Sequence, residues 1–161
     1  MSAWDNFFVA QVGASAALAG LLFVGLSINM TRILQFPVLP DRAMQALILL
    51  VTVLIVASLI LVPGASSTYL GVAILGIGAA VLGVLITLVR RVLRRTTPQY
   101  RHWFRHIEMG MTLLAGSLYL VAGAGLVAFG SVGLLALVPA MLLSYVITGL
   151  SSWVLLVEIN R

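Results

Sequence analysis

Residues 43–62 read AMQALILLVTVLIVASLILV, a stretch without a single charged side chain. A helix of about 20 apolar residues is long enough to cross the hydrocarbon core of a bilayer. Four more uncharged apolar runs of similar length lie at residues 7–28, 69–89, 109–129 and 132–157. We therefore predict an all-α integral membrane bundle of five transmembrane helices, which form a single transmembrane domain over residues 1–161.

The composition supports a membrane rather than an aqueous environment. Hydrophobic residues make up 62% of the chain and charged residues 8%, whereas soluble domains carry about 25% charged residues. One acidic residue and no basic residue precede the first apolar run. Because a cleaved signal peptide has a basic N-terminal region, we expect this run to be a true membrane span.

The basic residues are concentrated in alternate connections between the predicted spans. All nine are arginines, and the chain has no lysine. They fall at residues 29–42, 90–108 and 161, while the intervening connections contain none. Because positively charged loops stay in the cytoplasm, we expect the N-terminus outside and the C-terminus inside. The abundance of Arg, Ala, Gly, Val and Leu is typical of a GC-rich bacterial genome, so we expect a bacterial inner membrane location.

Residues that carry out catalysis or ion coupling are scarce in the apolar runs. The four acidic residues, Asp5, Asp41, Glu108 and Glu158, all lie near span ends. Proton relays and ion-coupled transporters usually place such a group inside the membrane. There is no cysteine, and the two histidines, His102 and His106, have no further close ligand nearby. We therefore expect no enzymatic activity, no metal and no cofactor.

The last apolar run has one face of small and polar residues. At helical periodicity, Ser144, Tyr145, Thr148, Ser151 and Ser152 share this face. Gln11, in the first run, is a further polar residue that should face protein or water. Two interpretations stay open: small hydroxyl residues allow close helix packing with hydrogen bonds across an interface, or the face lines a pore.

Glycine and proline add expectations about packing. The runs at 69–89 and 109–129 are rich in glycine, which permits tight contact within a protomer or between protomers in the membrane. We therefore expect a homo-oligomer. Pro139 lies inside the last run. Because proline removes one backbone hydrogen bond, we expect it to bend that helix.

The third connection, predicted as a cytoplasmic loop over residues 90–108, is rich in arginine and aromatic residues. Arginine binds phosphate groups, and aromatic residues settle at the headgroup level. We predict a contact surface for anionic lipid or for a membrane-protein partner. Nucleic acid is not expected, because no recognition fold has room to form. The residues of this predicted surface are Arg90, Arg91, Arg94, Arg95, Arg101, Trp103 and Arg105.

The N-terminal third has a recognisable pattern. It consists of the stretch WDNFFVAQVGASAALAGLLFVGLSIN at residues 4–29, followed by Arg32-Ile33-Leu34 and Leu39-Pro40-Asp41-Arg42-Ala43. This pattern resembles small multi-pass bacterial membrane proteins, common in actinobacteria, that are often labelled modulators of FtsH protease. The resemblance implies a partner role beside a membrane protease and supplies no functional residue.

The sequence favours a non-enzymatic accessory or regulatory membrane protein that acts through helix packing and a basic cytoplasmic loop. The alternative is a small homo-oligomeric channel lined by the polar face of the last helix. The two hypotheses differ in one structural expectation: a channel needs that face to be hydrated, whereas an accessory protein can bury it.

Overall fold

The structure is a computed structural model that describes residues 2–36, 39–95 and 102–159. The described part is helical and contains no strand. Its elements are α1 (Ser2–Ile28), α2 (Met30–Ile33), α3 (Leu39–Ile60), α4 (Ser67–Arg95), α5 (His102–Phe129), the 3-10 helix η1 (Gly130–Ala136) and α6 (Leu137–Ile159).

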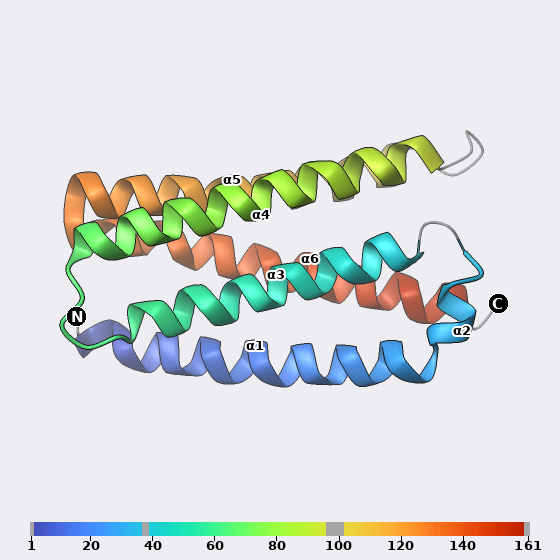
Figure 1. The fold of residues 1–161 in the computed structure, drawn as a ribbon, viewed down its shortest axis with the longest axis horizontal. Coiled ribbons are helices and arrows are strands. Elements are labelled where there is room, and N and C mark those ends of the chain that lie inside the picture. Colours follow the sequence, from blue (N-terminus) through green and yellow to red (C-terminus); the bar gives the residue numbers. More distant parts are fainter. Residues whose placement is uncertain (1, 37–38, 96–101, 160–161) are drawn as a thin grey trace.

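Four segments of the described chain are long and apolar enough to cross a membrane: Trp4–Ile28, Leu39–Ile60, Ser67–Arg94 and Met109–Trp153. These segments indicate a membrane protein. The last of them runs through α5, η1 and α6. The chain reverses direction at η1, so α5 and α6 run back along one another as a hairpin (Figure 1).

The five long helices pack as two pairs joined by α6. α4 packs along α5, and α1 packs along α3, while α6 contacts both α3 and α5 (Figure 1). α3 is the most buried of the long helices, whereas α1 lies at the edge of the bundle with most of its side chains exposed. A helix that is apolar on all sides can occupy such an edge only where lipid replaces water around it.

The two ends of the bundle differ in charge. The start of α1, the α3–α4 turn and η1 lie at one end, and the turns there use positive φ angles at Gly64 (76°) and Gly130 (62°). α2, the start of α3, the end of α4 and the start of α5 lie at the other end (Figure 1). Every arginine in the described residues belongs to one of these last four elements. Within the described residues, the bundle is therefore basic at one end only.

The connection predicted over residues 90–108 is helical where the structure describes it. α4 continues through Arg95, and α5 already begins at His102. Between them, residues 96–101 lie outside the described residues. Hydropathy marks where a helix leaves lipid, but arginine is a good helix former, so nothing ends α4 at the last apolar residue. The helices thus extend beyond the apolar runs that predicted them.

The last predicted span also begins later than expected. Residues 132–136 belong to η1, and α6 begins at Leu137. Pro139 is therefore in the first turn of α6 rather than inside the helix. The missing backbone N–H costs nothing there, because the first-turn N–H groups have no intrahelical acceptor. The expected bend at Pro139 is thus replaced by a helix start.

The α4–α5 contact depends on glycines. A Cβ atom added at Gly71 would lie 2.9 Å from the backbone oxygen of Gly123 and 2.9 Å from the backbone nitrogen of Val127. One added at Gly123 would lie 2.8 Å from the backbone nitrogen of Leu75. Missing side chains therefore bring the two backbones into direct contact, where many weak dispersion contacts add up.

We predict that Gly71→Ala lowers the free energy of unfolding by about 1–3 kcal/mol, because the new methyl group must push α5 away from α4. Gly76→Ala on the same helix is the matched control, since nothing lies within 4 Å of a Cβ at that position. The control should change stability by about 0.5 kcal/mol or less. Unfolding in detergent measures both, and equal effects of the two variants would contradict the assigned α4–α5 contact.

Candidate functional site

The polar face of α6 is largely buried inside a single protomer. Ser144 and Ser151 are 0% exposed, and Thr148 is 5% exposed. The three residues follow Ala140 at intervals of three or four, so they share the stripe of α6 that faces α3 and α5. This placement favours helix packing over a hydrated surface for these three hydroxyls.

Ser144 connects α6 to α5. Its Oγ donates to the backbone oxygen of Ala140 at 2.8 Å and lies 3.1 Å from the Tyr119 hydroxyl. Because the serine proton is used by Ala140, the tyrosine is the donor to Ser144. Tyr119 is 0% exposed and is the largest fully buried side chain. Together with the Ala140 carbonyl, the pair satisfies both buried hydroxyls.

Two further polar contacts tie α3 to its neighbours. Gln45 Nε2 donates to Thr112 Oγ1 of α5 at 2.6 Å, and both residues are buried. Thr148 Oγ1 of α6 donates to the backbone oxygen of Ala46 at 3.4 Å. Together with the Tyr119–Ser144 bond, these contacts join α3, α5 and α6 pairwise. We call the residues that make them, Gln45, Thr112, Tyr119, Ser144 and Thr148, the inter-helix polar set.

Gln11 takes part in the contact between α1 and α6. The Tyr145 hydroxyl donates to the backbone oxygen of Gln11 at 3.1 Å, and Ser15 Oγ donates to the same oxygen at 2.7 Å. The side-chain oxygen Oε1 of Gln11 is buried and has no hydrogen-bond partner in the structure. Of the two environments expected for Gln11, protein or water, the structure surrounds Oε1 with protein and gives this oxygen no donor.

The remaining residues of the predicted polar face, Tyr145 and Ser152, are half-buried. They line a groove of about 320 Å³ between α1 and α6, whose floor includes Leu50 of α3. We call this feature the α1–α6 groove. The predicted face is thus divided between Ser144 and Ser151 in the core and Tyr145 and Ser152 at the groove, and Thr148, although 5% exposed, also lines the groove.

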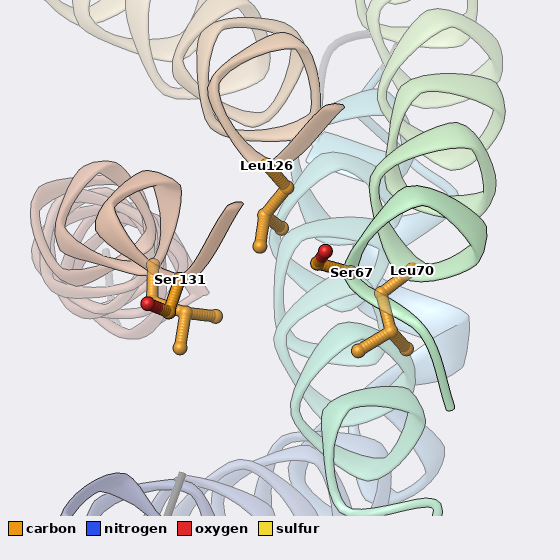
Figure 2. Close-up of a pocket in the computed structure, with 5 residues that line it drawn as sticks. Ser67, Leu70, Leu126 and Ser131 are labelled. Carbon is orange, nitrogen blue, oxygen red and sulfur yellow. The ribbon is translucent and has the colours of Figure 1, made fainter. Parts of the chain in front are cut away.

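A second pocket, of about 280 Å³, lies at the end of the bundle that has no arginine. Figure 2 shows Ser67 and Leu70 of α4 on one side, Ser131 of η1 on the other, and Leu126 of α5 near the middle. The two serines are the only hydroxyl groups among the lining residues. Because neither has a lining base to activate it, the pocket does not have the make-up of a nucleophilic site.

The basic end presents exposed arginines. The side chains of Arg90, Arg91 and Arg94 are exposed on the last turns of α4. Arg95, Trp103 and Arg105 lie in α4 or α5, but their side chains are not described, and Arg101 lies outside the described residues. Three members of the predicted anionic-lipid or partner surface are therefore placed on one helix end.

Three members of the inter-helix polar set were not among the candidate residues predicted from the sequence. Gln45, Thr112 and Tyr119 each stand within an apolar run. Thr112 and Tyr119 are seven residues apart, which places them on one face of a helix, and Gln45 is the sole amide of its run. This spacing and this single amide could have identified the three residues as candidates for hydrogen bonds between helices. Within the described residues, no group of three or more His, Cys, Asp and Glu side chains gathers.

Comparisons with known proteins return no match. A scan against protein-family models, a search of curated proteins and a search of solved structures each find no chain or model similar to this one.

The Tyr119–Ser144 bond predicts an asymmetry between two substitutions. Ser144→Ala leaves the Tyr119 hydroxyl buried without an acceptor, which should cost about 1–3 kcal/mol of unfolding free energy. Tyr119→Phe removes the donor but leaves Ser144 bonded to Ala140, so it should cost about 0.5–1 kcal/mol.

The double variant should be no less stable than Ser144→Ala alone, because no orphaned hydroxyl remains. Unfolding of all three variants in detergent completes the cycle. Additive losses would show that the two hydroxyls do not depend on one another.

Proposed function

We propose that the chain is a non-enzymatic accessory or regulatory membrane protein that acts through lateral helix contacts and a basic surface at one end. The observation that supports this most is the use of its polar groups: the inter-helix polar set joins α3, α5 and α6 inside one protomer. Groups held in this way stabilise a scaffold, while the exposed side chains include extensive apolar helix surface and several arginines.

The proposed topology has five crossings, with the N-terminus outside and the C-terminus in the cytoplasm of a bacterial inner membrane. The confinement of the described arginines to one end of the bundle supports it, since that end would face the cytoplasm. The hairpin of α5 and α6 supports counting the segment Met109–Trp153 as two crossings. The two ends of the chain then lie on opposite sides.

The proposed partners are anionic lipids at the cytoplasmic face, a second copy of the chain, and a membrane protein. Exposed Arg90, Arg91 and Arg94 support the first, because each such charge attracts anionic lipid by about 1 kcal/mol. Open glycine surface at Gly13 and Gly83 leaves room for another helix. The N-terminal resemblance to modulators of FtsH protease adds a membrane protease to the candidate partners.

The channel hypothesis has less support. Its lining would require Ser144 and Ser151 to face water, and both are fully buried within one protomer. An oligomer can form a passage between protomers only along surfaces that are still exposed, and the exposed side chains of α6 include Val146, Leu150 and Trp153. These are lipid-like rather than hydrophilic.

Thiol labelling can test the proposed topology. The chain contains no cysteine, so only an introduced cysteine in this protein can react. In intact cells, a membrane-impermeant maleimide should react with Thr68→Cys, at the arginine-free end. It should react with Arg94→Cys only after the membrane is permeabilised. Both positions are exposed in the structure, so the difference reports the side of the membrane. Reaction of both from the same side would reject five crossings.

Site-specific photo-crosslinking in native membranes tests the accessory role. A photoreactive residue at position 94 should form a discrete adduct with another protein, and the yield should fall about fivefold or more when Arg90→Gln and Arg91→Gln remove two nearby charges. The same residue at Val72, an exposed apolar position on α4, is the control for non-specific capture.

An adduct that persists without Arg90 and Arg91 would reject the basic end as the contact surface. If no protein adduct forms from position 94, and purified protein conducts ions in liposomes, the channel hypothesis replaces the accessory one.

A further inference from the structure

The α1–α6 groove is elongated along α1. On α1 its lining runs from Leu18 to Asn29, a distance of about 17 Å at the rise of an α-helix. A hydrocarbon core is about 30 Å thick, so the groove extends over about one leaflet. Its volume is about 320 Å³.

Two glycines keep the groove open. Gly25 of α1 and Gly149 of α6 both line it, and a Cβ added at either position would meet nothing within 4 Å. The helix pair is therefore separated along this length rather than in contact as α4 and α5 are. The contact that joins α1 to α6, between Tyr145 and Gln11, lies beyond Leu18, the end of the groove nearer the N-terminus of α1.

The lining is suited to a hydrocarbon rather than to water. Leu18, Leu22 and Leu50 supply apolar surface. Two of the three hydroxyls on the α6 side are engaged with protein, since Tyr145 donates to Gln11 and Thr148 donates to Ala46, which leaves Ser152 near the basic end. A water molecule needs two to four polar partners to occupy a buried site. A chain of methylene groups needs none, and it gains from the apolar surface.

The dimensions also exclude a helix as the occupant. An α-helix with side chains is about 10–12 Å in diameter, so a length of about 17 Å occupies well over about 1,000 Å³, which is more than the groove can hold. A second copy of this chain can therefore cover the groove but cannot fill it. The occupant must be as thin as a single extended chain.

The basic end of the groove provides a place for a charged headgroup. At this end the groove is lined by Asn29 and Ile33, and exposed Arg32 of α2 directly precedes Ile33 in the chain. Arginine's planar fork is suited to phosphate oxygens. A lipid with its phosphate near Arg32 would direct its acyl chain along the groove toward Leu18, over the depth of its own leaflet.

We propose that the α1–α6 groove binds one acyl chain of an anionic phospholipid from the leaflet at the basic end of the bundle, with the phosphate beside Arg32. The site makes a lipid an integral part of the contact between α1 and α6, because it fills the space that the two helices leave between them. The assignment of this leaflet as cytoplasmic rests on the proposed topology, whereas the groove itself does not.

Crosslinking from the lipid tests the proposal. The full-length protein is placed in lipid nanodiscs that contain phosphatidylglycerol with a diazirine either near the ester or at the end of the acyl chain. The ester-proximal probe should label the groove around Asn29 and Leu26, and the chain-end probe should label it around Leu18. Adducts at these positions should exceed those at exposed Leu114 and Val121 of α5, which contact bulk lipid.

Gly149→Leu should reduce the groove adducts by about tenfold, because the new side chain would exclude several methylene groups of the lipid. Gly76→Leu, an equally open position outside the groove, is the matched control and should leave them unchanged. If Gly149→Leu fails to fold by its detergent unfolding, Gly25→Leu fills the groove from the opposite wall. Phosphatidylcholine carrying the same probe should label the groove about fivefold less than phosphatidylglycerol.

Three results would overturn the proposal: groove adducts no stronger than those on α5, adducts unaffected by either filling substitution, or crosslinks from the groove to a second copy of the chain. Equal labelling by phosphatidylcholine would overturn the anionic headgroup. In membranes whose cytoplasmic leaflet alone carries the probe, full groove labelling fits both proposals. Labelling only from the opposite leaflet would overturn the topology and leave the groove site standing.

Discussion

Lipid offers no hydrogen-bond partner, and this one property of the solvent governs the arrangement of the bundle. A hydroxyl or amide that leaves the headgroup region must find its partner inside the protein. Gln45, Thr112, Tyr119, Ser144 and Thr148 meet this requirement by pairing across helix contacts. Because each bond joins a different pair among α3, α5 and α6, the polar groups set which faces of these helices meet.

Glycine controls how closely the other helices approach. At Gly71 and Gly123 the backbones of α4 and α5 are in contact, and added Cβ atoms would collide with main-chain atoms. At Gly25 and Gly149 the same residue type has the opposite consequence, since the missing side chains leave a groove between α1 and α6. One residue type thus produces a tight pair on one side of the bundle and a lipid-sized opening on the other.

Much of the architecture could be predicted from the sequence, because hydropathy reports directly on the solvent around a helix. The long apolar helices follow from uncharged runs, and the charge of one end follows from the position of the arginines. Helix ends were predicted less well. Residues 90–95 continue α4 although four of the six are arginines. Pro139 lies in the first turn of α6 rather than bending it. Neither helix propensity nor first-turn geometry is visible in hydropathy.

The site was only partly predictable for a related reason. Ser144, Thr148 and Ser151 share a helix face, which periodicity reveals, but periodicity does not say whether that face is wet or dry. The answer depends on Tyr119 and Gln45, which are distant in sequence and reach this region only after the helices pack. The partner of a polar residue inside a membrane is a tertiary property, and a single sequence does not specify it.

The central claim is that the hydroxyl face of α6 is dry, and the accessory function proposed for the chain depends on it. Cysteine substitution at Ser144, Thr148 and Ser151, one position at a time, followed by a small water-soluble thiol reagent in native membranes, tests it most directly. The account predicts no reaction at any of the three while an exposed position near a helix end reacts fully. Ready modification at these positions would contradict the account and show that water reaches the middle of the bundle.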